Sequence, residues 1–368
     1  MPLHALHDGK SGWKVSETPV PKPGPGMVTL RVRASGVCGS DLHYYPLRTE
    51  PETVPGGHEI AAEVADVGPG VTALKKGDRV APDMVGLVRA CMSCWYCRAG
   101  DYVKCTNGGQ RLGGGFAQYL PVPERACFKL SEKLSWEEGA LVEPLAVAVH
   151  GYRRAALKTY EVAVVLGAGA IGLSQVAAVR GLGAKTVIVT ARYPAQAGMA
   201  KRLGADVVVQ AEDDKPWMDA ASLPADRMTD KALPSGGSAL WDAVASATGG
   251  RGADAVFECV GGTSGVSLNQ AIAISRKGGR VVSVGAPKNL VPVNIIIMLR
   301  RELSLILSHC YSVTDGRHDF EIAADLIASG AAKVKPLVTH TFPLTDINTA
   351  YKTAGDKKAG ALKVQLLP

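Results

Sequence analysis

Short runs of alternating hydrophobic and polar residues characterise the first 145 positions, most clearly at residues 28–32, 60–64 and 116–120. Glycine and proline turn signals separate these runs. Alternation with a period of two between turns is typical of half-buried strands in an antiparallel sheet. The N-terminal part of the chain is therefore predicted to form a mainly antiparallel β-domain.

The pattern changes after Pro144, where short apolar runs alternate with alanine-rich stretches. The runs predict strands at residues 162–166, 186–190, 207–209, 255–259, 280–284 and 303–307, and the stretches predict helices at 172–181, 195–203 and 267–275. This alternation indicates βαβ units around a parallel sheet. A polar stretch at 212–238 interrupts the series and is interpreted as a surface excursion.

The C-terminal stretch predicts a helix at 319–329 and a strand at 363–367. We expect it to pack back on the first domain. The predicted fold class is therefore a two-domain α/β protein, with a mainly β domain at 1–145 completed by 308–368 and a doubly wound parallel sheet at 146–307.

The bulk composition supports two globular domains. The 368 residues exceed the size at which single cores stop growing, and 46% hydrophobic with 20% charged residues is typical of globular proteins. No apolar run approaches the roughly 18 to 20 residues of a membrane span, and the N-terminus lacks a secretion-signal pattern. The formal charge of +7 is spread along the chain without a basic run. These features predict a cytoplasmic location and neither a membrane nor a nucleic-acid partner.

A dinucleotide-binding motif follows the predicted strand at 162–166. The sequence Gly-Ala-Gly-Ala-Ile-Gly at 167–172 fits G-x-G-x-x-G and opens an alanine-rich helix, which is the context that makes this motif specific. Gly167 permits the tight turn, Gly169 lets the backbone approach a pyrophosphate, and Gly172 lets helix and strand pack closely. The remaining candidate cofactor-binding residues are Ile171, Val260, Val284 and Gly285.

The end of the next predicted strand bears on the choice of cofactor. NAD-binding proteins carry Asp or Glu here to bind the ribose hydroxyls, but this chain reads Thr190, Ala191, Arg192. A small alanine leaves room for a 2′-phosphate, and arginine offers it a planar charged donor. We therefore predict that NADP(H) is preferred over NAD(H); the alternative is a solvated Arg192 and NAD binding without the acidic clamp.

Two groups of residues suggest metal binding. Cys91, Cys94, Cys97 and Cys105 supply four thiolates from one loop, the set that closes the tetrahedral shell of a structural zinc. A second group, Cys38, His58, Glu59 and Glu143, combines one thiolate, one imidazole and carboxylates. Such an incomplete shell suits a catalytic zinc, because water or substrate takes the last position.

These motifs together resemble the zinc-containing medium-chain alcohol dehydrogenases, in particular the sorbitol/polyol and butanediol dehydrogenase-like branch. The resemblance covers nearly the whole chain, and its motifs occur in the family's order, at residues 38–44, 57–59, 77–80, 91–105, 114–119, 141–146 and 167–172. It implies a GroES-like first domain, a Rossmann second domain and a site between them.

The resemblance also implies roles for single residues. Cys38, His58 and Glu59 would hold the catalytic zinc, and Glu143 would be a direct ligand or hold the metal water. The other implied catalytic residues are Asp41, which would orient His58, and Ser40 and His43, which would relay the alcohol proton. The implied substrate contacts are Tyr44 and Tyr311, although Cys310-Tyr311 stands where polyol dehydrogenases carry an Arg-Tyr pair.

The predicted function is zinc-dependent hydride transfer between NADP(H) and a secondary alcohol or ketone, a diol or polyol, with ketone reduction favoured in the cell. Alternatives are an NAD-dependent threonine- or sugar-phosphate-type dehydrogenase, a zinc-free quinone reductase relative, a catalytically silent homologue, and a nucleic-acid-binding zinc protein. The apolar run at 291–299 predicts a homodimer or homotetramer, with a buried core segment as the alternative.

Overall fold

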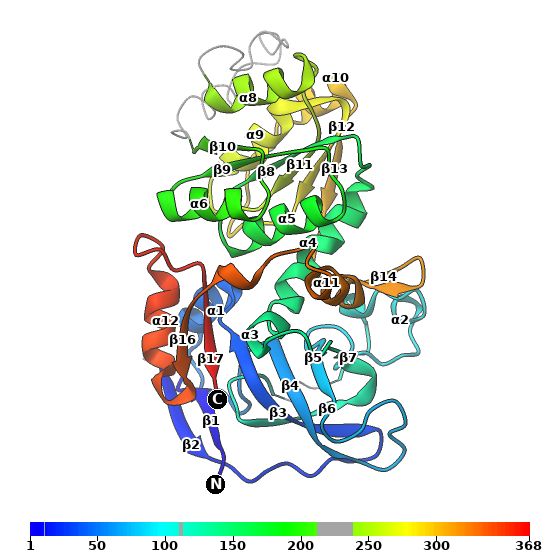
Figure 1. The fold of residues 1–368 in the computed structure, drawn as a ribbon, viewed down its shortest axis with the longest axis vertical. Coiled ribbons are helices and arrows are strands. Elements are labelled where there is room, and N and C mark those ends of the chain that lie inside the picture. The colour runs from blue at the N-terminus through cyan, green and yellow to red at the C-terminus, as the bar shows by residue number, and fades with distance from the viewer. Residues whose placement is uncertain (11, 110–112, 212–237) are drawn as a thin grey trace. The chain divides into compact units, whose positions relative to one another are not determined.

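The computed structural model describes residues 1–10, 12–109, 113–211 and 238–368. The predicted excursion at 212–238 lies outside the described residues, except for Ser238. The chain forms two compact units, one of residues 1–146, 310–330 and 334–368 and one of residues 147–309 and 331–333 (Figure 1). Their independence as domains, predicted from the change in sequence pattern, stays a prediction.

A seven-stranded sheet forms the body of the first unit. Its order is β16-β17-β3-β4-β5-β7, with β6 also pairing with β3. Every pairing is antiparallel except that of β16 with β17. The strands are β3 (Met27–Gly36), β4 (Glu59–Val67), β5 (Arg79–Pro82), β6 (Tyr119–Pro123), β7 (Cys127–Lys129), β16 (Val338–Pro343) and β17 (Lys363–Leu367). Because β17 pairs with β3, the C-terminal segment completes the N-terminal sheet.

The first unit also contains the strands β1 (Leu3–His7), β2 (Trp13–Glu17), β14 (Val313–Thr314) and β15 (Arg317–His318) and the helices α1 (Gly39–Tyr44), α2 (Trp95–Arg98), α3 (Trp136–Gly139), α11 (Asp319–Ala328) and α12 (Ile347–Gly355). Helix α4 (Val142–Ala155) leads from the first unit into the second.

One strand of the first unit begins later than its pattern predicts. The run at 116–120 predicts a strand from Phe116, but β6 starts at Tyr119. Phe116 is fully buried, with its ring centroid 5.1 Å from that of Trp13 and 5.9 Å from that of Tyr351. Edge-on aromatic packing and burial of a large ring outweigh the alternation at this point.

Six parallel strands form the sheet of the second unit, in the order β10-β9-β8-β11-β12-β13. They are β8 (Val162–Leu166), β9 (Thr186–Ala191), β10 (Val207–Gln210), β11 (Ala253–Glu258), β12 (Ser275–Ser283) and β13 (Ser304–Leu307). The predicted doubly wound parallel sheet is thus confirmed. The strand order reverses between β8 and β11, which is where sheets of this type bind dinucleotides.

Helices cover both faces of this sheet (Figure 1). On one face lie α5 (Ala170–Gly181) and α6 (Pro194–Arg202), and on the other lie α8 (Ala239–Thr248), α9 (Val266–Ile274) and α10 (Ile295–Arg301). Alternate residues of β8, such as Val164, pack with the α8, α9 and α10 side chains in one buried cluster. Burial on two faces explains why these strands are continuous apolar runs in the sequence.

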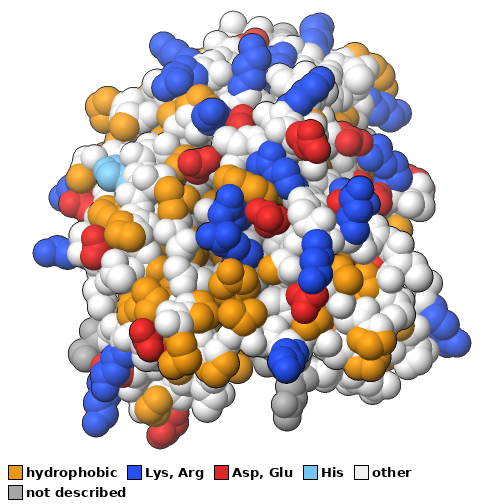
Figure 2. All heavy atoms as spheres, turned by 60° about the horizontal axis from the view of Figure 1, so that its bottom comes forward, with side chains coloured by type: hydrophobic (Ala, Val, Ile, Leu, Met, Phe, Trp, Pro, Cys, Tyr) orange, Lys and Arg blue, Asp and Glu red, His pale blue; other side chains and the backbone are white. Residues whose placement is uncertain are grey.

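The surface agrees with the spread of charge along the chain. Figure 2 shows one face on which Lys and Arg side chains are interspersed with Asp, Glu and hydrophobic ones, without a continuous basic stripe. Within the described ranges, no helix is long and apolar enough to cross a membrane.

Candidate functional site

Three residues of the predicted catalytic metal site converge where β3 ends and β4 begins. Cys38 follows β3, His58 precedes β4 and Glu59 opens it. One donor atom from each of the three lies within 4.8 Å of the others. Gly36 pairs with Glu59 across the strands, and a Cβ at Gly36 would lie 2.0 Å from the Glu59 Oε2. The close approach of this carboxylate therefore needs a glycine, and the three donors fit the ligand set of a zinc ion.

A buried lysine, which the sequence analysis missed, neutralises the carboxylate of this group. Lys363 Nζ donates to both carboxylate oxygens of Glu59, at 2.6 Å and 2.8 Å. Both side chains are almost inaccessible, with 3% of Lys363 and none of Glu59 exposed. Burial acts to lower the pKa of Lys363, but the Glu59 and Cys38 charges outweigh it and raise that pKa. The signal in the sequence was a lysine at the start of β17, a strand whose other residues are apolar except Gln365.

Asp41 lies close to His58. Its carboxylate accepts the Cys38 N–H at 3.0 Å, and its other oxygen lies 3.8 Å from His58 Nδ1. Burial raises the pKa of Asp41. For His58, burial acts to lower the pKa, but the Cys38 thiol and then Asp41 raise it overall. Anionic neighbours thus favour a positive charge at this point, the condition that also favours a divalent cation.

Glu143 is not part of the group within 4.8 Å. It lies in the first turn of α4, is 5% exposed, and has a pKa raised to about 7, chiefly by burial. The charge of His58 opposes this rise, which places Glu143 in the electrostatic field of the metal group. The structure therefore brings Cys38, His58 and Glu59 into one shell and leaves Glu143 beside it.

A pocket of about 350 Å³ opens onto this group. Ser40 of α1 is half-buried and His43 is exposed. Tyr44, a predicted substrate contact, lines the pocket and is 65% exposed. The lining residues are Ser40, Asp41, Tyr44, Tyr45, Arg48, Gly57, His58, Met84, Val85, Arg89 and Gly113. Two of the predicted relay and ligand residues, Ser40 and His58, therefore face the same space.

Tyr311 differs from Tyr44 in its surroundings. It is 2% exposed, and its ring lies edge-on to Phe320 with the centroids 4.7 Å apart. Burial, followed by the Asp83 charge, raises the pKa of Tyr311 well above its usual range. Its role as a substrate contact stays a prediction.

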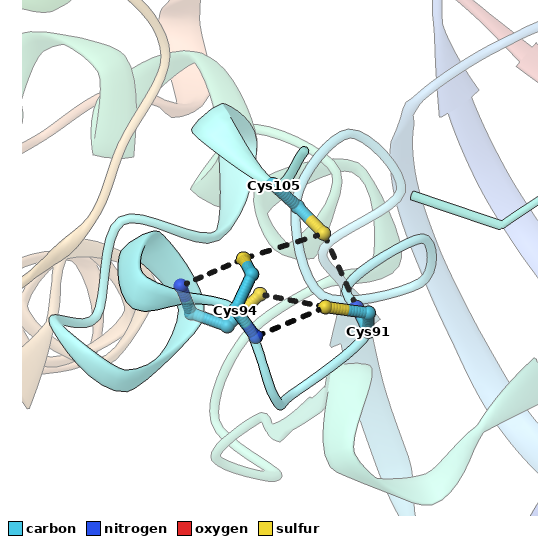
Figure 3. Close-up of side chains that lie close together, drawn as sticks. Cys91, Cys94 and Cys105 are labelled. Atoms are coloured by element: carbon cyan, nitrogen blue, oxygen red, sulfur yellow. Dashed lines mark hydrogen bonds between the residues drawn. The ribbon is translucent and has the colours of Figure 1, made fainter. Parts of the chain in front are cut away.

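The four cysteines of the predicted structural zinc loop form a second group of donor atoms within 4.8 Å of one another. Figure 3 shows the Cys91, Cys94 and Cys105 side chains gathered within the loop. Backbone N–H groups point at the sulfurs: Cys94 N donates to Cys91 Sγ at 3.3 Å, and Cys97 N donates to Cys94 Sγ at 3.5 Å. A four-cysteine structural site is therefore present.

The acidities of these thiols differ with their surroundings. Hydrogen bonds from the Ser93 hydroxyl and from nearby backbone N–H groups lower the pKa of Cys91 to about 5. Burial raises the pKa of Cys97 to about 12. A bound divalent cation favours the thiolate form of all four ligands.

The three glycines of the dinucleotide loop differ in backbone conformation and in the space around them. Gly167 has φ +90°, and a Cβ at Gly172 would lie 1.7 Å from the Gly167 carbonyl oxygen. Gly169 caps the N-terminus of α5, and a Cβ there would meet no described atom within 4 Å. The loop thus leaves open space in front of a helix N-terminus, where the aligned N–H groups favour an anion.

The residues expected to select the cofactor end β9. Ala191 is buried, and Arg192 is exposed. The backbone of Arg192 is held by Gln196 Oε1 and Gln210 Nε2, but within the described part of the chain its guanidinium makes no hydrogen bond or ion pair. A fixed backbone with an uncommitted cation is compatible with binding a phosphate.

The loops after β11 and β12 lie beside the glycine loop. A Cβ at Gly167 would lie 2.6 Å from Val260 Cγ2, and one at Gly285 would lie 2.3 Å from the backbone N of Gly261. Glu258, which the sequence analysis also missed, is buried and accepts the N–H groups of Val260 and Gly261, each at 2.8 Å. This carboxylate shapes the loop at the point where the strand order reverses. Val284 and Gly285 are half-buried here, and Ile171 is half-buried in the first turn of α5.

Comparison with known proteins agrees with this geometry. Residues 24–132 match the family model of the alcohol dehydrogenase GroES-like domain, and residues 170–329 match that of the zinc-binding dehydrogenases. Sorbitol dehydrogenase from Bacillus subtilis (strain 168) is 30% identical over 367 residues, which cover 96% of this chain and 94% of that protein. The chain belongs to the zinc-dependent medium-chain dehydrogenase family.

Other relatives of this dehydrogenase agree with its assignment. L-arabinitol 4-dehydrogenase from Aspergillus niger is 33% identical over 354 residues, covering 93% of this chain and 86% of that protein. A Sinorhizobium meliloti 1021 protein whose crystal structure holds NADP superposes with a TM-score of 0.82 at 28% identity, covering 100% of this chain and 99% of that one. The protein is thus an enzyme, an oxidoreductase of the polyol and alcohol dehydrogenase type.

Proposed function

We propose that this dehydrogenase interconverts a secondary alcohol of a diol or polyol with the corresponding ketone, uses NADP(H) in preference to NAD(H), and works mainly as a ketone reductase in the cell. The observation that supports the chemistry best is the shared pocket of Ser40 and His58, because the His58 ring also belongs to the metal-ligand group. The polyol names of the sorbitol and arabinitol dehydrogenases support the substrate class.

Cys38, His58 and Glu59 are proposed to hold the catalytic zinc, with Glu143 as a further ligand or as the group that holds the metal water. A zinc ion held by these residues would supply a Lewis acid for the substrate oxygen, and a bound nicotinamide dinucleotide would supply or accept the hydride. Lys363 donates to both carboxylate oxygens of Glu59 and offsets the negative charge of this ligand, so the site would retain more of the positive charge that polarises the substrate. Asp41 orients the His58 ring.

Ser40 and His43 are proposed to move the alcohol proton. Ser40 Oγ would accept it inside the pocket while passing on its own hydroxyl proton, and His43 would deliver a proton to solvent. The two residues stand three positions apart in α1 and so share a helix face, with Ser40 half-buried and His43 exposed. This order of exposure is the one that a relay from pocket to water requires.

The preference for NADP(H) is inferred from Ala191 and the uncommitted guanidinium of Arg192. Reduction of ketones is inferred in turn, since a cytoplasmic pool of this cofactor is kept reduced. None of the eight cysteines, all of which lie among the described residues, forms a disulfide. This supports the proposed cytoplasmic location, where thiols stay reduced.

A steady-state screen tests the proposal. Zinc-loaded enzyme is assayed with NADPH and NADH against acetoin, diacetyl, fructose and xylulose, before and after o-phenanthroline. We expect chelator-sensitive turnover with a higher kcat/KM for NADPH, and Arg192→Ala should lower kcat/KM for NADPH about tenfold or more, with a smaller effect on NADH. Equal kcat/KM values for the two cofactors in the wild-type enzyme would contradict the NADP(H) preference.

A homodimer or homotetramer is proposed from the edge of the parallel sheet. Strand β13 ends the sheet order, and large apolar side chains nearby are exposed, at Leu290, Ile295, Leu299 and Leu307. A second subunit could pair with the free edge of this strand and bury the exposed apolar residues, which would stabilise both. A monomeric mass by light scattering at micromolar concentration would contradict this assembly.

A further inference from the structure

We propose that the pocket selects substrates carrying an anionic group, a carboxylate or a phosphate monoester, at the end remote from the reacting carbon, and that Arg89 binds this group with help from Arg48. The inference rests on the proposed function, because it takes this pocket as the place where the alcohol or ketone reacts. Both arginines line the pocket that Ser40 and His58 also line.

The backbone that carries Arg89 is held firmly. Buried Asp83, at the start of its loop, accepts the N–H groups of Val85 at 3.1 Å, Gly86 at 2.6 Å and Leu87 at 2.9 Å. The Arg89 N–H in turn donates to the Gly86 carbonyl at 3.1 Å. An arginine on a fixed loop loses less entropy on binding than one on a mobile segment.

The Arg89 guanidinium is mostly uncommitted. Its Nε donates to the Gly109 carbonyl at 3.2 Å, and within the described ranges it makes no ion pair. Both terminal nitrogens therefore remain as donors, in the geometry that matches two oxygens of a carboxylate or phosphate. Of the two pocket arginines, Arg89 is the one without a carboxylate partner among the described residues, whereas Arg48 pairs with Glu52.

Arg48 is more committed, and we assign it the second role. Its Nη1 lies 2.6 Å from a carboxylate oxygen of buried Glu52, and its guanidinium carbon lies 5.3 Å from the Tyr45 ring centroid. These contacts fix the side chain and cancel part of its charge. Arg48 is thus a positioned cation whose field adds to that of Arg89.

Among the described lining residues, no carboxylate is free to neutralise the two arginines. The single carboxylate of the lining is Asp41, which is buried and committed to the Cys38 N–H and to His58. A pocket of about 350 Å³ is large enough for a small polyhydroxylated molecule. A neutral substrate would leave Arg89 facing water, whereas an anionic one would pair with it.

Three ketones that differ in their remote end provide the test. Fructose is neutral, fructose 6-phosphate carries a phosphate, and 5-ketogluconate carries a carboxylate. In both anions the same number of carbons separates the ketone carbon from the terminal carbon, which bears the phosphate ester in one and is the carboxylate carbon in the other. With NADPH and zinc-loaded wild-type enzyme, we expect kcat/KM for at least one anion to exceed that for fructose about tenfold to a hundredfold. The anion that shows the advantage identifies the group as phosphate or carboxylate.

Arginine variants test whether Arg89 causes the higher kcat/KM for the anionic ketone. Arg89→Ala should lower kcat/KM for the anionic ketone at least tenfold more than for fructose, mainly through KM, and Arg89→Lys should recover part of the loss. Arg31→Ala removes an exposed arginine on β3 outside the pocket, and it should leave the anion-to-neutral ratio as in the wild type. A wild-type ratio at or below one, or a ratio unchanged in Arg89→Ala, would overturn the inference.

A direct measurement of anion binding tests this inference independently of the proposed function. If no ketone or alcohol is turned over with either cofactor, the proposed function fails, and calorimetric titration with gluconate and with inorganic phosphate then decides the inference. Binding that weakens at least tenfold in Arg89→Ala, but not in Arg31→Ala, upholds the anion site. Absent binding, or equal binding to wild type and Arg89→Ala, overturns it.

Discussion

Replacing Lys363 with methionine tests the buried ion pair beside the metal group. Lys363→Met keeps most of the side-chain volume but removes the cation that both oxygens of Glu59 accept. Glu59 is fully buried, so water cannot replace the lost donor. Removing one partner of a buried pair costs about 3 to 5 kcal/mol of folding free energy, because an uncompensated charge remains. We expect the melting temperature of the zinc-free enzyme to fall by on the order of 10 °C.

Zinc should offset part of this loss. A cation bound by Cys38, His58 and Glu59 compensates the same carboxylate, and binding to the folded state alone stabilises it. The difference in melting temperature between wild type and Lys363→Met should therefore be larger with chelator than with zinc. The assay is thermal unfolding followed by circular dichroism under both conditions.

A matched double variant completes this test. Glu59→Gln combined with Lys363→Met removes both charges, so without zinc it should be more stable than Lys363→Met alone. The reasoning is refuted if Lys363→Met unfolds within about 1 kcal/mol of the wild type in the presence of chelator. It is also refuted if the double variant is no more stable than the single one.

Three further predictions concern other parts of the structure. Gly172→Ala should lower the free energy of unfolding by about 3 kcal/mol, because its Cβ would lie 1.7 Å from the Gly167 carbonyl oxygen. Gly169→Ala, whose Cβ has open space, should fold normally but bind the cofactor more weakly. Urea unfolding and NADPH titration measure the two effects, and equal behaviour of the two variants would contradict this prediction. Cys105→Ser should lose one zinc per chain by atomic absorption and lower the melting temperature, and an unchanged zinc content would contradict the four-thiolate site. Hydrogen bonds from arginines outweigh burial and hold the pKa of Asp254 well below its usual range, so its stabilising effect should be full above about pH 4 and be lost as pH falls towards the lowered pKa. The stability gap between wild type and Asp254→Asn should therefore narrow from pH 7 to pH 3, and a constant gap would refute this assignment.

The sequence by itself determined those features whose residues are close together in the chain. The cysteine loop spans residues 91–105 and the glycine motif 167–172, so spacing alone specifies which atoms can meet. The parallel sheet could also be predicted, because strands buried on two faces are continuous apolar runs. Element ends were less predictable, as at Phe116, whose packing with distant rings delays the start of β6.

The tertiary structure decided what depends on distant residues. Lys363 and Glu59 are 304 positions apart, and no local pattern indicates that a lysine in a C-terminal strand will pair with a carboxylate after the first long strand. Arg48 and Arg89 likewise look like solvated charges in the sequence and face one pocket only in the fold. Burial and partner distance set the energy of a charge, and both are properties of the folded chain rather than of residue order.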